Sequence, residues 1–342
     1  MTDPHVKAML PAEAEALAVS LGERRYRGRQ ILEWIHARNA GAYAEMSSLP
    51  KRFRARLEQR FPFDVLEEER RVRAADGTEK RLLRTPEGFA VEAVLMPRGK
   101  FLSACVSSQA GCPLACRFCA TGRTGFKRDL LPEEIVEQVL LLRRASPAPL
   151  THVVFMGMGE PLLNLDAVLR ALRVLTHPGA GGFPPSRITV STAGVVEGLE
   201  RLAREETGVN VALSLNAPDD ATRKRLMPGA AKTPLADILR AFETIPASRR
   251  HPKTLEYLLL AGENDAPWQA RKVASIARRT KAKVNLIPCN EVKGMPFRAP
   301  PERQVEAFLK ILSDARVTAT VRRSQGAEIA AACGQLAGRS SR

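Results

Sequence analysis

Three cysteines in the middle of the sequence have a spacing that suits metal–sulfur chemistry. Cys112, Cys116 and Cys119 form a C-x3-C-x2-C run. Three thiolates on one tight loop can hold three irons of a 4Fe–4S cluster and leave the fourth iron without a protein ligand. A structural zinc site needs four protein ligands, and no nearby His or Cys completes such a set. The run therefore predicts an iron–sulfur cluster with one iron open to a small molecule.

The other three of the six cysteines carry weaker signals. Cys105 lies in an apolar segment, Cys333 lies in the short run Ala-Ala-Ala-Cys-Gly, and Cys289 stands alone. Taken singly, each resembles a small buried apolar residue. Six cysteines in 342 residues are too few for a disulfide scaffold.

Two carboxylates occur in settings that allow chemistry. Glu160 belongs to Gly157-Met158-Gly159-Glu160-Pro161, directly after an apolar run. Glycines allow a ligand to approach the backbone, and a carboxylate there can bind an ammonium group. Glu92 is one acidic residue inside the run Val91–Leu95, where the ordinary interpretation is the solvent side of a hairpin.

The elements that position these residues alternate between strands and helices from residue 101 onward. Strands are predicted at 101–107, 152–156, 188–191, 209–215, 254–260, 283–287 and 317–321. Helices are predicted between them at 132–144, 165–175, 195–204, 235–244, 267–279 and 301–315. Such alternation predicts a parallel sheet, as an open or partial barrel, with the active site at the carboxyl ends of its strands.

The residues before this repeat have a different character. Helical spacing at 12–21, 28–40 and 50–60 predicts a small helical unit, with basic clusters at 24–29 and 51–56 that could contact phosphates. Short β-like runs at 81–84 and 89–96, separated by Thr-Pro-Glu-Gly, predict a hairpin. We therefore divide the chain into a helical domain (1–68), a β extension (69–98) and a core barrel with a C-terminal tail (99–342).

The composition restricts the class of protein. A hydrophobic fraction of 44% excludes a mostly disordered chain. The 53 Lys and Arg residues exceed the 37 Asp and Glu residues, and the net charge of +16 suggests a polyanionic partner. No run approaches the roughly 18 apolar residues of a spanning helix, and no secretory signal is visible at 1–21. We expect a cytoplasmic protein that does not bind a membrane.

The cysteine run resembles the signature of the radical S-adenosylmethionine (SAM) enzymes. Further segments are similar to the RlmN/Cfr family of RNA adenosine methyltransferases, over nearly the whole chain. They are 26–36 (YRGRQILEWIH), 105–122 (CVSSQAGCPLACRFCATG), 155–164 (FMGMGEPLLN), 190–196 (VSTAGVV), 214–220 (SLNAPDD), 285–290 (NLIPCN) and 330–338 (AAACGQLAG). This resemblance implies an α/β fold with a partial (β/α)6 radical SAM barrel. It also implies one 4Fe–4S cluster, held by Cys112, Cys116 and Cys119, and SAM as the second cofactor.

The resemblance also assigns catalytic roles. The family methylates an electrophilic adenine carbon in two steps, so that one SAM methylates a cysteine and a second yields a 5′-deoxyadenosyl radical. Cys333 matches the methyl-carrying cysteine. Cys105 matches the partner that releases the product through a transient disulfide, which requires Cα atoms within roughly 7 Å. Glu92 matches the proton acceptor, and whether Glu92 or Cys105 takes the substrate proton stays open.

By the same resemblance, SAM is bound by polar groups at the strand ends. These residues are Gly159, Glu160, Ser191, Ser214, Leu215, Asn216 and Asn290. Two of the motifs depart from the family. Asn216 stands where the family often has His, and both residues can donate a hydrogen bond. Cys289 replaces a usual aromatic residue, and we interpret it as a small filler.

The family's substrates imply the partners. They are adenosine 2503 of 23S rRNA and adenosine 37 of certain tRNAs, methylated at C2, with flavodoxin or ferredoxin as electron donor. We expect this activity, in a monomer. Two alternatives stay open, namely methylation at C8, as in the Cfr branch, and an iron–sulfur RNA-binding protein that transfers no methyl group.

Overall fold

The computed structural model describes residues 4–144, 146, 148–247 and 253–338. The ends of the two outer predicted domains, residues 1–3 and 339–342, lie outside this part of the chain. In the described residues a ten-stranded mixed sheet runs in the order β1-β2-β3-β4-β7-β8-β9-β10-β11-β12. A separate two-stranded sheet pairs β5 (Gln109–Ala110) with β6 (Arg128–Asp129).

Seven neighbouring strands of the large sheet are parallel, as the alternation predicts. They are β4 (Phe101–Cys105), β7 (Leu150–Phe155), β8 (Ile188–Thr192), β9 (Asn210–Ser214), β10 (Thr254–Leu259), β11 (Lys283–Pro288) and β12 (Ala319–Val321). Their carboxyl ends meet at one edge of the sheet, where the following loops must supply any active site.

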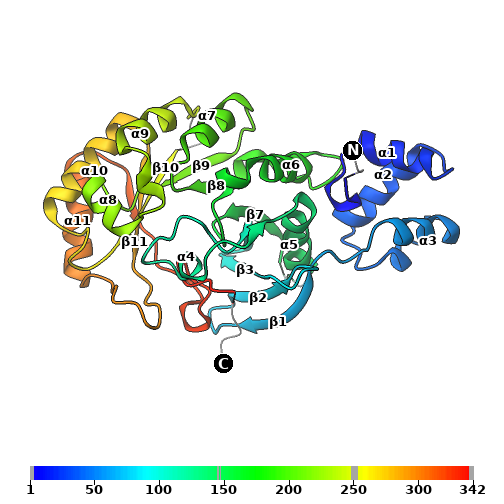
Figure 1. Ribbon diagram of the computed structural model, residues 1–342, viewed down its shortest axis with the longest axis horizontal. Helices are drawn as coiled ribbons and strands as arrows, with labels where there is room; N and C mark the ends of the chain where they lie inside the picture. Colours follow the sequence, from blue (N-terminus) through cyan, green and yellow to red (C-terminus); the bar gives the residue numbers. More distant parts are fainter. Residues whose placement is uncertain (1–3, 145, 147, 248–252, 339–342) are drawn as a thin grey trace.

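One long helix connects each pair of successive parallel strands. These helices are α5 (Pro132–Arg144), α6 (Leu165–Thr176), α7 (Val196–Arg204), α9 (Leu235–Thr244), α10 (Pro267–Thr280) and α11 (Glu302–Asp314). Helix α6 buries Leu165, Val168, Leu169 and Leu172, which lie on one face at helical spacing. Six βα units and a final strand form an open, partial (β/α)6 barrel, which confirms the predicted fold class (Figure 1).

Short helical segments complete the barrel and its loops. Two are α-helical, α4 (Ala120–Thr124) and α8 (Asp220–Leu226), and the sequence patterns did not predict them. Four are 3-10 turns, η4 (Pro161–Asn164), η5 (Pro185–Arg187), η6 (Ala230–Lys232) and η7 (Ala327–Ile329). None of the helices in the described part of the chain is long and apolar enough to cross a membrane.

Three antiparallel strands extend the barrel sheet at one edge. The expected hairpin is formed by β2 (Glu79–Arg84) and β3 (Ala90–Arg98), and β3 pairs with β4. An unexpected third strand, β1 (Glu67–Arg73), pairs with β2. Its sequence, Glu-Glu-Glu-Arg-Arg-Val-Arg, shows no apolar alternation because it is an edge strand that is largely exposed to solvent.

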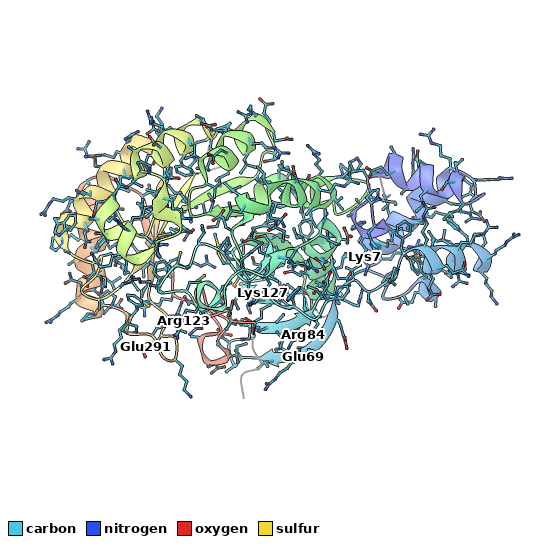
Figure 2. The ribbon with its side chains drawn as sticks, viewed as in Figure 1. Lys7, Glu69, Arg84, Arg123, Lys127 and Glu291 are labelled. Carbon is cyan, nitrogen blue, oxygen red and sulfur yellow. The ribbon has the colours of Figure 1, made fainter. Side chains whose placement is uncertain are left out.

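The N-terminal helices form a unit at one end of the molecule (Figure 1). They are α1 (Pro11–Ser20), α2 (Tyr26–Leu32) and α3 (Lys51–Arg60), with the short segments η1 (Val6–Ala8), η2 (Glu33–Ala37) and η3 (Tyr43–Glu45). Gly28 lets α2 approach α1 closely, because a Cβ there would lie 2.3 Å from the backbone of Ala14. A buried ion pair between Lys7 and Glu137 joins this unit to α5, and Figure 2 marks Lys7 at the junction.

Candidate functional site

A cavity lies at the carboxyl ends of the parallel strands. It is lined by the three cysteines of the C-x3-C-x2-C run and by polar residues from the carboxyl ends of β7, β8 and β9. The predicted residues among its lining are Cys112, Cys116, Cys119, Gly159, Glu160, Ser191, Ser214, Asn216 and Cys333. The fold therefore brings together groups that are up to 221 residues apart in the sequence, from Cys112 to Cys333.

The cysteine loop is held by close backbone contacts. Gly111 has a φ of +79°, and a Cβ on it would lie 1.8 Å from the carbonyl oxygen of Gly125. The amide of Arg117 donates to the carbonyl of Leu226 on α8 at 2.9 Å, and the amide of Gly229 donates to Leu114 at 3.0 Å. These contacts fix the loop against α4 on one side and against α8 on the other.

The three thiols suit a cluster better than a single metal ion. Among the described residues, no three His, Cys, Asp or Glu side chains are arranged to hold one ion. The thiolates of a 4Fe–4S cluster each bind a different iron, so they do not need to converge on one point. Burial raises the pKa of Cys112 to about 12 and raises that of Cys116, and neighbouring thiolates add to both shifts. Three thiolates on one tight loop require positive charge between them, which a cluster's irons supply.

The Gly-Met-Gly-Glu-Pro segment lines the cavity through its backbone. Gly159 has a φ of +99°, and a Cβ there would lie 2.6 Å from the side chain of Gln109. Both oxygens of the Glu160 carboxylate accept backbone hydrogen bonds, from Leu162 at 3.0 Å and from Ala193 at 2.7 Å. Burial raises the pKa of Glu160, and these hydrogen bonds oppose the rise. Glu160 therefore ties two strand-end loops together as well as lining the cavity.

Other predicted SAM-binding residues lie at the next strand ends. The hydroxyls of Ser191 and Ser214 are 3.1 Å apart, so that β8 and β9 present them side by side. The side-chain Oδ1 of Asn216 accepts from the backbone amide of Leu258 at 2.9 Å, with Asn216 itself at a φ of +49°. Leu215 is fully buried and is absent from the cavity lining.

Asn290 is also absent from the lining, and it contacts the tail that carries Cys333. Its Nδ2 donates to the backbone carbonyl of Cys333 at 3.1 Å and to the hydroxyl of Ser324 at 2.8 Å. Cys289, its neighbour, is buried in a cluster of apolar residues. Asn290 therefore positions the tail next to the cavity.

Cys333 lines two adjoining cavities. The first contains the cluster cysteines, and the second is lined by both Cys105 and Cys333. All six cysteines are free thiols in this structure. Burial raises the pKa of Cys105 to about 12 and also raises that of Cys333, while the Arg322 guanidinium lowers both. Cys105 and Cys333, for which the resemblance implies a transient disulfide, therefore line one pocket together with Arg322.

Glu92 lies outside both cavities, buried beneath the tail. Its Oε1 is 3.0 Å from the ammonium of Lys80, and its Oε2 accepts from the amides of Ala337 at 2.8 Å and Gly338 at 3.2 Å. It is on β3, which pairs with the strand of Cys105, but it is not on the solvent side of the hairpin. The ordinary interpretation of its sequence position is therefore wrong.

Three charged residues near the site carry no prediction from the sequence. Glu256 on β10 lines the first cavity, Arg322 lines the second, and Arg223 on α8 is fully buried behind the first. The position of Arg322 directly after β12 was a usable signal, whereas Glu256 lies within β10. Arg223 offered none, because its neighbours in α8 are ordinary charged helix residues.

The basic clusters of the helical unit divide into two groups. Arg25 and Arg29 both pair with Glu15, and Arg54 and Arg56 donate to backbone carbonyls within the unit. The second group is exposed and forms no ion pair with any described residue; its members are Arg24, Lys51 and Arg52. Arg123 and Lys127, which follow the cysteine loop in the sequence, are also exposed, and Figure 2 shows them in the lower middle of the view, away from the helical unit.

Comparisons with known proteins identify the family to which the chain belongs. Residues 106–272 match the model of the radical SAM superfamily, and residues 9–62 match that of the ribosomal RNA large subunit methyltransferase N-terminal domain. The chain is 45% identical to the dual-specificity RNA methyltransferase RlmN of Syntrophobacter fumaroxidans over 97% of both chains. It is 46% identical to that of Solidesulfovibrio magneticus over 95% of this chain and 93% of the other.

A solved structure shares the whole fold. The radical SAM methyltransferase from Sphaerobacter thermophilus is 39% identical in sequence and superposes with a TM-score of 0.94. The superposition covers 98% of this chain and 100% of the other. Sequence identity of this extent over nearly the full length shows common descent with these proteins. The chain belongs to the RlmN family within the radical SAM superfamily.

Proposed function

We propose that the chain is an RNA methyltransferase that methylates C2 of adenosine 2503 in 23S rRNA and of adenosine 37 in tRNA. The observation that carries the proposal is the position of Cys333, which lines both the cavity with the cluster cysteines and the pocket with Cys105. A methyl carrier has to face the methyl donor in one step and its resolving partner in another. The names of the relatives, which are dual-specificity RNA methyltransferases, support the substrate class.

The three cysteines of the loop hold the cluster in this proposal. Gly159, Glu160, Ser191, Ser214 and Asn216 bind SAM at the strand ends, together with Leu215 and Asn290. When bound, the cluster and SAM supply the methyl group and the radical that activates it. Serine hydroxyls and backbone groups suit a ribose and an amino acid moiety, because both need several donors and acceptors.

Cys333 carries the methyl group as S-methylcysteine. Its thiolate takes the methyl group of SAM, so that the new sulfur–carbon bond forms as the bond between the methyl group and the SAM sulfur breaks and S-adenosylhomocysteine leaves. Arg322 favours that thiolate by its charge. The activated S-methyl carbon then bonds to the adenine carbon and so links Cys333 to the RNA. Cys105 breaks this link by forming a disulfide with Cys333, while the carbon keeps the electron pair of the broken bond and takes up a proton as the new methyl group. An external thiol reductant must then reduce the disulfide. The proton that the adenine carbon loses is accepted either by Cys105 or by Glu92, the latter once the tail amides release its carboxylate.

A cytoplasmic monomer that receives electrons from a flavodoxin or ferredoxin completes the proposal. The net charge of +16 suits an RNA partner, and the exposed cations of the helical unit offer phosphate contacts. Among the described residues no membrane-spanning helix occurs.

The proposal is tested by one anaerobic reaction. Full-length protein is reconstituted with iron and sulfide and incubated with SAM, dithionite and 23S rRNA. Mass spectrometry should detect 5′-deoxyadenosine together with 2-methyladenosine. Formation of 8-methyladenosine would favour the Cfr-type alternative. Formation of 5′-deoxyadenosine without methylated RNA would indicate another substrate. If neither product formed, the alternative of an RNA-binding protein that transfers no methyl group would be favoured.

A further inference from the structure

Arg223 is a charged side chain that is fully buried near the cysteine loop. Its exposed fraction is 0%, and it is among the largest side chains that are completely buried. It does not line the cavity. A guanidinium removed from water costs several kcal/mol unless charge and hydrogen bonds compensate.

The hydrogen bonds of Arg223 satisfy only part of its guanidinium. Nη1 donates to the carbonyl of Leu215 at 3.1 Å, and Nη2 donates to the carbonyl of Ala193. Nε is buried and has no partner among the described residues. Among the described residues Arg223 forms no ion pair, so no adjacent carboxylate neutralises it.

One of the groups that favour the charged form of Arg223 belongs to the cysteine loop. Burial lowers the pKa of Arg223, and Cys116, Asp220 and Glu160 raise it, with Cys116 contributing most of the three. Asp220 is exposed, so water screens it, and both oxygens of Glu160 already accept backbone hydrogen bonds. Helix α8 also contacts the loop directly, through the hydrogen bond from Arg117 to Leu226 and the packing of Leu226 and Met227 near Phe118.

We propose that Arg223 is the buried counter-charge of the iron–sulfur cluster and that it raises the cluster's reduction potential. A cluster held by three thiolates is more negative by one unit after it accepts an electron. A fixed cation nearby stabilises the reduced form more than the oxidised form, since net charge and burial set cluster potentials. Arg223 stays protonated throughout, and no bond forms or breaks at it. It takes no part in the reaction itself and acts on the cluster through its charge alone.

This inference rests on the cluster that the proposed function requires. The test is a redox titration of the full-length, anaerobically reconstituted protein with dithionite, followed by electron paramagnetic resonance of the reduced cluster. Wild type is compared with Arg223→Met and Arg223→Gln, which remove the charge, and with Arg223→Lys, which keeps it. The matched control is Arg225→Met, because Arg225 is exposed on the same helix and pairs with Glu263 at 2.9 Å.

We expect the Met and Gln variants to load iron and sulfide but to be reduced less readily. At the midpoint reduction potential of the wild-type cluster, the ratio of reduced to oxidised cluster in these variants should be about tenfold lower. This corresponds to a midpoint potential that is lower by about 59 mV for a one-electron step. Arg223→Lys and Arg225→Met should titrate like wild type. An unchanged midpoint in loaded Arg223→Met, or an equal shift in Arg225→Met, would overturn the inference.

If both neutral variants fail to fold, the lysine variant decides. It keeps the charge but loses the forked hydrogen bonds to Leu215 and Ala193. A wild-type midpoint in Arg223→Lys supports a role for the charge, whereas a lowered midpoint contradicts it. A wild-type protein that takes up no cluster would instead reject the proposed function itself, so the two failures are distinguishable.

Discussion

The Lys80 ammonium lies 3.0 Å from the Glu92 carboxylate, and both side chains are buried. They sit on neighbouring antiparallel strands, β2 and β3. Lys80 also donates to the carbonyl of Ala330 at 3.1 Å, and Glu92 accepts from the amides of Ala337 and Gly338. The pair therefore forms hydrogen bonds with the tail on both sides of Cys333 in the sequence.

Removal of one member of the Lys80–Glu92 ion pair should destabilise the folded protein. Lys80→Met leaves a buried carboxylate without its cation, which should lower the free energy of unfolding by about 3–5 kcal/mol. Urea unfolding measures this, and Lys127→Met, at an exposed position, is the control. In the double variant Lys80→Met, Glu92→Leu most of the loss should be recovered. No recovery would show that the charge of Glu92 is not what makes the single change costly.

The two thiols of the second cavity should have separate effects. Cys333→Ala should abolish RNA methylation because no S-methyl group can form. Cys105→Ala should instead accumulate a covalent protein–RNA species, visible on a denaturing gel, because release from Cys333 is blocked. Cys289→Ala should retain activity, since Cys289 is packed among apolar residues. Full product from Cys333→Ala, or no covalent species from Cys105→Ala on productive RNA, would count against these roles.

The conformation of the cysteine loop depends on Gly111. In Gly111→Ala the new methyl group would meet the carbonyl of Gly125, and the residue also has a φ of +79°. The loop has to move, so iron and sulfide uptake should fall several-fold. Gly88→Ala is the matched control, because Gly88 has a φ of +84° but a Cβ added to it would meet no atom within 4 Å. Equal iron content in both variants would mean that the clash is relieved without disturbing the thiols.

Mild acid should destabilise the protein through two buried histidines. Burial lowers the pKa of His5 to about 4 and that of His36 to about 3. Both are neutral in the folded state, whereas in the unfolded chain they take up protons below their ordinary pKa of about 6.5. The stabilising contribution of the two neutral histidines is therefore fully present above about pH 6.5. It is lost as the pH falls toward their folded-state pKa values, and the free energy of unfolding should decrease by about 2 kcal/mol per histidine between about pH 7 and 5.

Thermal melting at pH 7 and pH 5 tests this, with His36→Leu as the informative variant. Neither ring nitrogen of His36 has a hydrogen-bond partner among the described residues, so leucine should melt at or above wild type at pH 7. It should also lose less stability at pH 5. His177→Ala, at a partly exposed position, should keep the wild-type difference. The same acid loss in His36→Leu would remove His36 as a cause.

The sequence by itself determined the local features. The seven parallel strands and six connecting helices follow from apolar periodicity, and helices α5 and α9 begin and end at the predicted residues. The three cysteines of the loop are eight residues or fewer apart, so their spacing alone makes them neighbours. Local periodicity and spacing survive folding because they depend on bonds along the chain.

Only the tertiary structure decided how distant groups meet. It places Cys105 and Cys333 in one pocket, covers Glu92 with the tail amides, and buries Arg223 beside the cysteine loop. It also forms β1, whose charged sequence becomes a strand only through pairing with β2. Such contacts depend on the packing of elements from separate parts of the chain, and one-dimensional patterns carry no information about that packing.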